Sequence, residues 1–218
     1  MKIHPAEVAT LLHSAEHATL ATQSQQLPGY PYATAVPCVT DAAHCPILFV
    51  SLLAEHTRNL LADARSSLSL VAPEHGSVQA APRLSLIGDC RPIDAPPLLV
   101  DRYLRYQPEA AQYLALDFRF FRLQPLRLRY IGGVGRMGWL EADDWQALDT
   151  LTLEDEAQLL RALSAELPEH IRLLGIDCYG LDCSLHGQRQ RHRFALPSTQ
   201  LEELAQAARQ LLARLSAR

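Results

Sequence analysis

The chain lacks any apolar run long enough to cross a membrane, and residues 1–5 lack the hydrophobic segment of a signal peptide. It also lacks an excess of charge of one sign, since 20 lysines and arginines stand against 24 aspartates and glutamates. The resulting net charge of −4 creates no global field that would draw the protein to nucleic acid or anionic lipid. We therefore expect a cytoplasmic protein without nucleic-acid or membrane partners.

No zinc pattern and no local nucleophile pattern occur in the sequence. The five cysteines are scattered, and no second cysteine or histidine pair completes a site with Cys178 and Cys183. His13 and His17 are four residues apart, but no carboxylate or third histidine lies at a ligand spacing near them. We predict reduced, mostly buried thiols and no metal site, and local spacing identifies no catalytic residue.

Hydrophobic residues make up 48% of the 218 positions, which is ample for a buried core. Strand-like segments dominate the first two thirds of the chain, at residues 18–22, 32–39, 47–51, 67–71, 83–88, 118–123 and 126–131. The last two are divided at Gln124-Pro125. Short helices are expected at 5–17, 57–63 and 96–106. This order favours a six-stranded antiparallel barrel over repeated βαβ units.

The pattern changes after Trp139. A helix is predicted at 153–167, three short strands at 171–177, 181–185 and 192–196, and a final helix after a Ser198 or Thr199 cap. We therefore expect an α+β protein of two domains. Residues 1–145 form the barrel, and residues 146–218 form a small α-β-β-β-α domain.

The junction between the strand at 47–51 and the next helix carries a candidate anion site. The strand ends at Ser51, and His56, Thr57 and Arg58 open the helix. The first N–H groups of a helix have no partner within it, and the helix dipole places partial positive charge there. With a guanidinium, a hydroxyl and an imidazole added, this end suits a phosphate. The alternative is that Glu55, His56 and Thr57 cap a surface helix and Arg58 is solvated.

Two further features of the barrel region allow more than one interpretation. Arg83 opens a half-buried strand, where it either faces water or points into a cleft to hold an anion or a carbonyl-rich ring. Residues 132–138 contain four glycines but follow a strand outside any βαβ unit, which argues against a dinucleotide fingerprint. We expect these glycines to allow a sharp turn or close approach to another subunit.

Several of these segments together resemble one family. Residues 29–37, Phe49 to Ser51 with residues 54–60, residues 83–88, and Gly132 to Gly135 before Trp139 occur in the order found in pyridoxamine-phosphate-oxidase-like FMN-binding split barrels. The chain is most similar to the HugZ-type haem-utilisation branch, which carries an appended α/β domain. Residues 5–140 match the barrel, and 150–218 match the appended domain more loosely.

The resemblance implies a split barrel that forms homodimers and binds FMN in clefts at the dimer interface. It places Tyr32 to Val36 along the flavin ring, Phe49 and Ser51 beside the ribityl chain, and Arg83 near the ring. His56, Thr57 and Arg58 fall where the family binds the phosphate. The cofactor-binding residues expected from the resemblance are therefore Tyr32, Thr34, Val36, Phe49, Ser51, His56, Thr57, Arg58 and Arg83.

The sequence also departs from the family. Nothing after Trp139 reproduces the arginine-containing motif of authentic pyridoxamine-phosphate oxidases. Residues 161–166 and the helix at 211–218 lack the histidines found in the haem-utilisation branch. We expect an FMN-dependent oxidoreductase that is not an authentic pyridoxamine-phosphate oxidase. The alternatives are a haem-binding or haem-degrading protein, with haem as cofactor, and a non-catalytic dimer that binds a partner protein.

Overall fold

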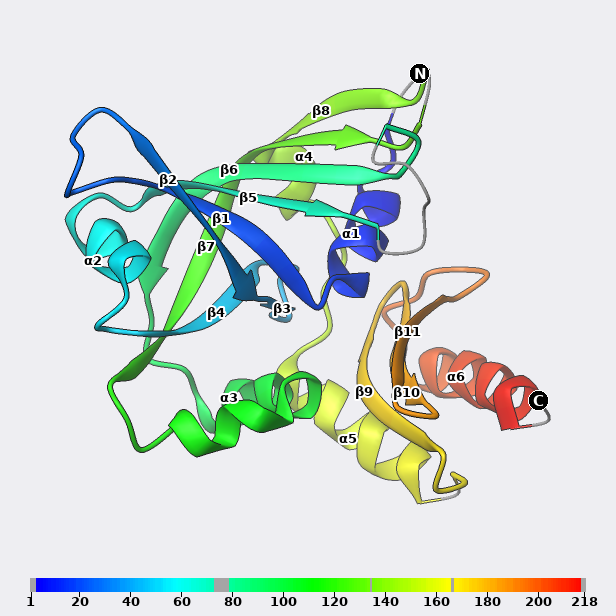
Figure 1. The fold of residues 1–218 in the computed structure, drawn as a ribbon. Coiled ribbons are helices and arrows are strands. Elements are labelled where there is room, and N and C mark those ends of the chain that lie inside the picture. The colour runs from blue at the N-terminus through cyan, green and yellow to red at the C-terminus, as the bar shows by residue number, and fades with distance from the viewer. Residues whose placement is uncertain (1–2, 73–78, 134, 166, 217–218) are drawn as a thin grey trace.

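The computed structural model describes residues 3–72, 79–133, 135–165 and 167–216, in which an eight-stranded sheet stands beside a three-stranded one. Figure 1 shows the larger sheet curled into a half-open barrel, with the smaller sheet and its helices at one side. The strand pairs of both sheets are antiparallel. The α+β class and the antiparallel split barrel are confirmed. No helix in the described part of the chain is long and apolar enough to span a membrane.

The barrel strands run in the order β2-β1-β5-β6-β7-β4-β3, and β8 pairs with β7. They are β1 (His17–Gln23), β2 (Pro31–Pro37), β3 (Val39–Thr40), β4 (Pro46–Ser51), β5 (Arg65–Val71), β6 (Arg83–Pro92), β7 (Phe118–Ile131) and β8 (Met137–Glu141). The small sheet, in the order β11-β10-β9, consists of β9 (Ile171–Asp177), β10 (Gly180–Leu185) and β11 (Gln188–Arg193). The helices are α1 (Pro5–Ser14), α2 (Glu55–Ala62), α3 (Pro97–Tyr106), the 3-10 helix η1 (Pro108–Tyr113), α4 (Ala142–Gln146), α5 (Leu153–Ser164) and α6 (Leu201–Ser216).

Alternating side chains give the barrel sheet two different faces. Directly paired positions on neighbouring strands place a row of buried leucines on the inner face: Leu20, Leu68, Leu86, Leu128 and Leu140. The adjacent row points to the opposite side, which we call the outer face: Thr19, Ser69, Ser85, Arg129 and Trp139. Burial of the leucine row away from water supplies the main driving force for closing the sheet.

Two strands add to the six that the sequence predicts. β3 is only two residues long, and β8 begins within the glycine-rich segment 132–138, which was expected to allow a sharp turn or close approach to another subunit. By contrast, the two segments expected on either side of Pro125 form one strand, β7. Pro125 pairs with Gly88 at a register shift, and at this point the other edge of β7 changes partner from β4 to β8. A proline is tolerated here because neither neighbour needs its missing N–H.

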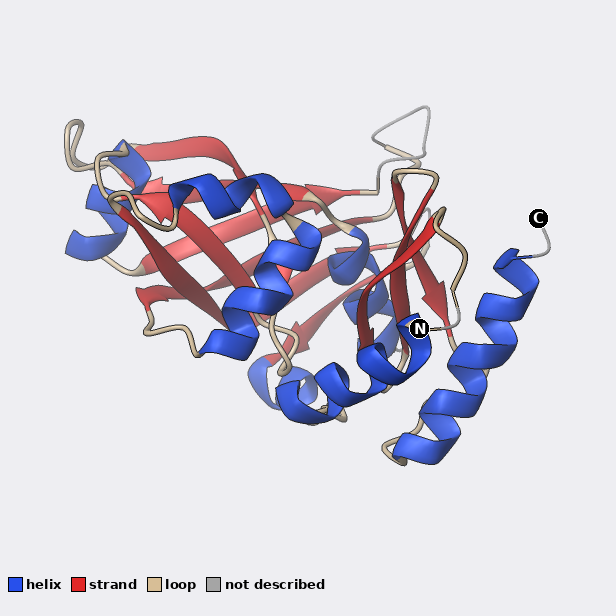
Figure 2. Cartoon of the chain, turned by 90° about the horizontal axis from the view of Figure 1, so that it is seen from below, coloured by secondary structure: helices blue, strands red, loops and turns tan. Residues whose placement is uncertain are grey.

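Residues 153–216, which we call the C-terminal module, follow the predicted α-β-β-β-α order. α5 and α6 contribute to an apolar core on one side of the small sheet, and α1 and α3 contact its strands from the barrel side. Figure 2 shows α6 standing along the outer side of this sheet. β11 lies at 188–193 and not at the predicted 192–196, because its polar sequence carries no apolar alternation. The division at residue 145 stays a prediction, since Leu148 packs against both cores.

Buried polar side chains also connect the C-terminal module with the barrel. Arg102 of α3 donates to the carbonyl oxygen of Thr40 at 2.7 Å and forms an ion pair with Glu156 of α5. The hydroxyl of Tyr106 donates to Asp182 Oδ2 at 2.6 Å. All five residues are buried. We call this set the polar interface, and its partners must all be satisfied because water does not reach them.

Candidate functional site

The predicted anion site lies at the start of α2, which follows β4 through residues 52–54. Ser51 builds the turn: its Oγ accepts from the Leu53 N–H at 3.1 Å, and its carbonyl accepts from the Ala54 N–H at 3.2 Å. No side chain caps the helix at Ala54, so the capping part of the alternative is wrong, whereas Arg58 is exposed as the alternative expects. The N–H groups of its first turn are therefore not satisfied by a capping side chain.

The three residues expected to bind phosphate differ in exposure. Arg58 is exposed, His56 is half-buried and Thr57 is fully buried. His56 Nε2 and Thr57 Oγ1 are both buried without a hydrogen-bond partner among the described residues. Burial lowers the pKa of His56, which favours its neutral imidazole. Arg58 and the helix end thus face solvent, whereas the Thr57 hydroxyl points inward.

Asn59 is a structural residue of this region that sequence reasoning did not assign. It is fully buried; its Oδ1 accepts from the Gln25 N–H at 3.0 Å, and its Nδ2 donates to Thr22 Oγ1 at 3.0 Å. These bonds anchor α2 to the end of β1. No local pattern could reveal them, because the two partners lie 34 and 37 residues away in the sequence.

Tyr32, Thr34 and Val36 share one face of β2, because alternate residues of a strand point to the same side. Tyr32 pairs with Thr22, which contacts Asn59, so it lies at the α2 end of the strand. Val36 lies at the other end and is buried in the barrel core. Of the three residues, Tyr32 is the one that the structure brings toward the anion site.

Phe49 and Arg83 do not join the α2 region within one chain. Phe49 is buried in an aromatic cluster, with its ring centroid 4.4 Å from that of Phe120. Arg83 pairs with Val71, at the opposite end of β5 from Arg65, which closely follows α2. A strand of this length separates its two ends by roughly 20 Å. The predicted cofactor residues therefore do not form one pocket in a single chain.

A shallow groove of about 460 Å³ lies on the outer face, at the same end of the strands as α2. Ala21, Pro31, Ser67, Ile87 and Leu126 are among its lining residues. Its volume falls within the range of small-molecule sites, and small side chains make its floor flat. The arrangement thus offers an apolar surface for a planar ring and, separately, an anion site at α2.

Comparisons with known proteins bear on both features. The sequence profile of the family described as CREG, beta-barrel, matches residues 2–147. The chain is 36% identical over 131 residues to the non-canonical heme oxygenase HOZ, chloroplastic, of Arabidopsis thaliana, and this match covers 59% of the chain. It spans only 40% of that relative's length.

Two solved structures resemble nearly the whole chain. The heme binding protein from Mycobacterium smegmatis is 26% identical, with a TM-score of 0.62 and 100% of both chains covered. The protein Atu2129 of Agrobacterium tumefaciens, described as of unknown function, is also 26% identical, with a TM-score of 0.73 over 96% of this chain and 95% of that one. The combination of barrel and C-terminal module is therefore also found in these two bacterial proteins.

Proposed function

Because the chain belongs to the CREG β-barrel family, we propose that it is a haem-binding protein of the split-barrel, haem-utilisation type. The observation that carries the proposal is the 36% identity over 131 residues to a protein named as a heme oxygenase. The likeness of the whole chain to a heme binding protein supports it further, because that match includes the C-terminal module.

The residues at α2 fit the acidic edge of haem. Its propionates are carboxylates, and the uncapped first turn of α2 and the exposed guanidinium of Arg58 are suited to bind them. His56 supplies a neutral imidazole with an unpartnered nitrogen at the same end. Haem, when bound, supplies a redox-active iron, while these residues bind and orient its acidic groups.

Haem titration tests this proposal. Addition of haem to the purified protein should produce a shifted Soret band that saturates at a fixed ratio of haem to chain. Arg58→Ala should raise the Kd for haem about tenfold or more, because it removes one charge-assisted hydrogen bond. Arg161→Ala, which changes an exposed arginine of α5, is the matched control and should leave the Kd unchanged. An unshifted haem spectrum would contradict the proposal.

FMN is the second candidate, and the donor set at α2 favours it. A guanidinium, an imidazole and free helix N–H groups suit a phosphate even better than a carboxylate, because a phosphate carries more charge. FMN in this site would make the protein an FMN-dependent oxidoreductase, in which the flavin supplies the redox chemistry. Titration with FMN, and with riboflavin, which lacks the phosphate, tests whether this site binds FMN through its phosphate. Quenching of FMN fluorescence that weakens in Arg58→Ala, with riboflavin binding unaffected, would support FMN over haem.

The outer face supports a further proposal, a homodimer formed through the barrel. Large apolar side chains are exposed there beside small ones: Val71, Ile87, Leu126, Met137 and Trp139. Patches of this kind on a sheet mark interaction surfaces. A second copy would cover the groove at Ala21 and Ile87 and complete a pocket that one chain leaves open.

Light scattering coupled to size-exclusion chromatography tests the dimer. The native protein should have twice the chain mass of 24.2 kDa, and Ile87→Glu should reduce it to the mass of one chain, because a buried carboxylate would lack a partner. Leu196→Glu changes an even more exposed apolar residue outside the barrel and should leave the mass unchanged. A native mass of 24.2 kDa would exclude this dimer.

A further inference from the structure

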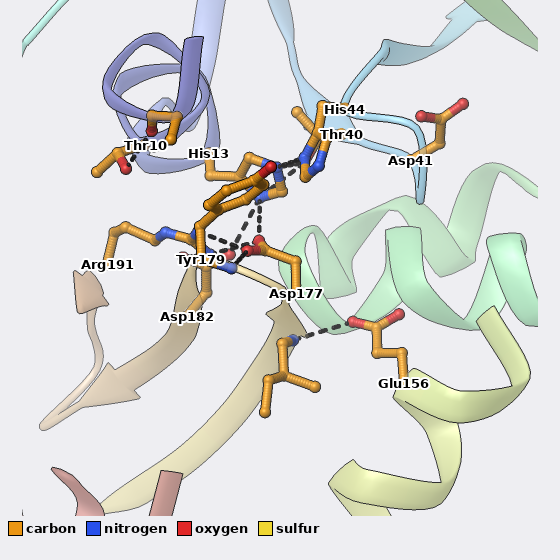
Figure 3. Close-up of polar contacts among 12 residues, drawn as sticks. Thr10, His13, Thr40, Asp41, His44, Glu156, Asp177, Tyr179, Asp182 and Arg191 are labelled. Carbon is orange, nitrogen blue, oxygen red and sulfur yellow. Dashed lines mark hydrogen bonds and ion pairs between the residues drawn. The ribbon is translucent and has the colours of Figure 1, made fainter. Parts of the chain in front are cut away.

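Two histidines and an aspartate meet where the barrel joins the C-terminal module. His13 comes from α1, His44 from the turn between β3 and β4, and Asp177 from the end of β9. All three are buried, and one ligand atom from each lies within 4.8 Å of the other two. Figure 3 shows the three side chains pointing toward one another from separate elements.

The hydrogen bonds around His44 prepare one of its nitrogens as a ligand. His44 Nε2 lies 3.0 Å from the carbonyl oxygen of Asp149, and only an N–H can make that bond. In the neutral tautomer that makes this bond, Nδ1 carries the lone pair, and it lies 2.9 Å from His13 Nε2. Imidazoles that bind metals are commonly oriented in this way, by donating their other N–H to a carbonyl or carboxylate.

The backbone at His44 adds an independent observation. Its φ of +57° lies in the left-handed region, which is unfavourable for a residue with a Cβ. The Asp41 carboxylate holds the turn, accepting from the N–H groups of Ala43 and Cys45 at 2.9 and 2.8 Å. A strained backbone held by its surroundings, with its side chain directed into a buried polar cluster, indicates a constrained function for that side chain.

The other ring nitrogen of His13, Nδ1, lies near three side-chain oxygen atoms. It lies 3.0 Å from Thr40 Oγ1, 3.4 Å from Asp177 Oδ2 and 3.6 Å from Asp182 Oδ2. Arg191 also binds Asp177, with Nη1 and Nη2 at 2.7 and 2.9 Å from its two oxygens. Each carboxylate oxygen has two lone pairs, so Asp177 can accept from Arg191 and still face the imidazoles. The Asp182 carboxylate offsets the positive charge of Arg191.

We propose that His13, His44 and Asp177 form a binding site for one zinc ion that joins the barrel to the C-terminal module. Two imidazole nitrogens and one carboxylate oxygen are a ligand set that zinc prefers. Zinc takes the place of the proton between the two rings. That proton moves from His13 Nε2 to Nδ1, where Thr40 Oγ1 at 3.0 Å can accept it in a hydrogen bond, so His13 binds the ion as a neutral imidazole. The sequence could not reveal the site, because His44 lies 31 residues after His13 and Asp177 lies in the C-terminal module.

Metal analysis of the full-length protein tests the proposal. Protein that is stripped with a chelator, dialysed against zinc and then against metal-free buffer should retain one zinc ion per chain by mass spectrometry. Zinc should also raise its Tm, because an ion that binds only the folded state stabilises it. A stripped native protein that takes up no zinc overturns the site, and this outcome does not depend on any variant folding.

His44→Asn is the decisive variant, because asparagine tolerates the left-handed backbone but lacks the imidazole. It should keep the native circular-dichroism spectrum and lose the zinc and the zinc-dependent rise in Tm. The matched control removes His170 and His186, whose rings stack 4.9 Å apart near the surface and could collect zinc adventitiously. His170→Ala/His186→Ala should still retain one ion. Zinc retained by His44→Asn, or lost only in the control, overturns the proposal.

Discussion

Replacing Glu156 by alanine should lower the free energy of unfolding by about 3–5 kcal/mol, because it leaves a buried arginine without its counter-ion. Arg102 is 2% exposed, and it pairs with Glu156 Oε1. Burial alone would lower the pKa of Arg102, but Glu156 raises it well above its ordinary value, so the guanidinium stays charged. Glu156 also accepts from the Ile176 N–H at 3.2 Å and pairs with Arg105 at 3.2 Å. Urea denaturation measures the loss.

Two further variants separate the charge from the packing. Glu154→Ala removes an exposed carboxylate from the same first turn of α5 and should change the free energy of unfolding by less than about 0.5 kcal/mol. Arg102→Met/Glu156→Leu replaces both charges by apolar groups and should recover most of the lost stability. A loss below about 1 kcal/mol in Glu156→Ala would show that water reaches Arg102 and that the polar interface is not sealed.

The barrel strands could be predicted because the alternation of apolar and polar residues that marks a strand lies within a few consecutive positions. Strand alternation alone places Leu68 and Leu86 on the inner face and Ser69 and Ser85 on the other, and the structure confirms this division. The sequence predicts two strands divided at Pro125, because a proline has no N–H to donate to a neighbouring strand. Whether a neighbouring strand needs that N–H depends on the partners of β7, which sequence periodicity does not contain.

The candidate site was less predictable because it depends on contacts distant in sequence. The start of α2 was identified from residue types, and the structure places an uncapped helix end there. The inward direction of Thr57 and the anchoring by Asn59 follow from packing against β1. Arg83 was expected near the flavin ring through a resemblance, yet within one chain it lies at the far end of β5 from α2.

Gly175→Ala should destabilise the protein by about 3–5 kcal/mol, because a methyl group there would displace Tyr106. A Cβ on residue 175 would overlap the hydroxyl oxygen of Tyr106 and would lie 3.0 Å from Glu156 Oε1. Burial and the neighbouring Asp182 raise the pKa of Tyr106 well above its ordinary value, so the hydroxyl keeps the proton that it donates. The variant thus combines overpacking with the loss of a buried hydrogen bond to a carboxylate. Thermal and urea denaturation measure the loss.

Tyr106→Phe in the Gly175→Ala background decides whether this contact is the cause. Removal of the hydroxyl oxygen makes room for the methyl group, so the double variant should be more stable than Gly175→Ala alone. Tyr106→Phe by itself should be destabilising, since it leaves Asp182 Oδ2 without its donor at 2.6 Å. A double variant more stable than Gly175→Ala, although each single change is destabilising, would show that the clash with the hydroxyl is the cause. The absence of a side chain at Gly175 of β9 then lets Tyr106 of α3 reach Asp182 of β10. If the double variant is no more stable than Gly175→Ala, the clash lies with the groups that Tyr106→Phe leaves in place. These are the ring carbon Cζ of residue 106 and Glu156 Oε1, each 3.0 Å from the added Cβ, and the hydroxyl then does not set the spacing between the barrel and the C-terminal module.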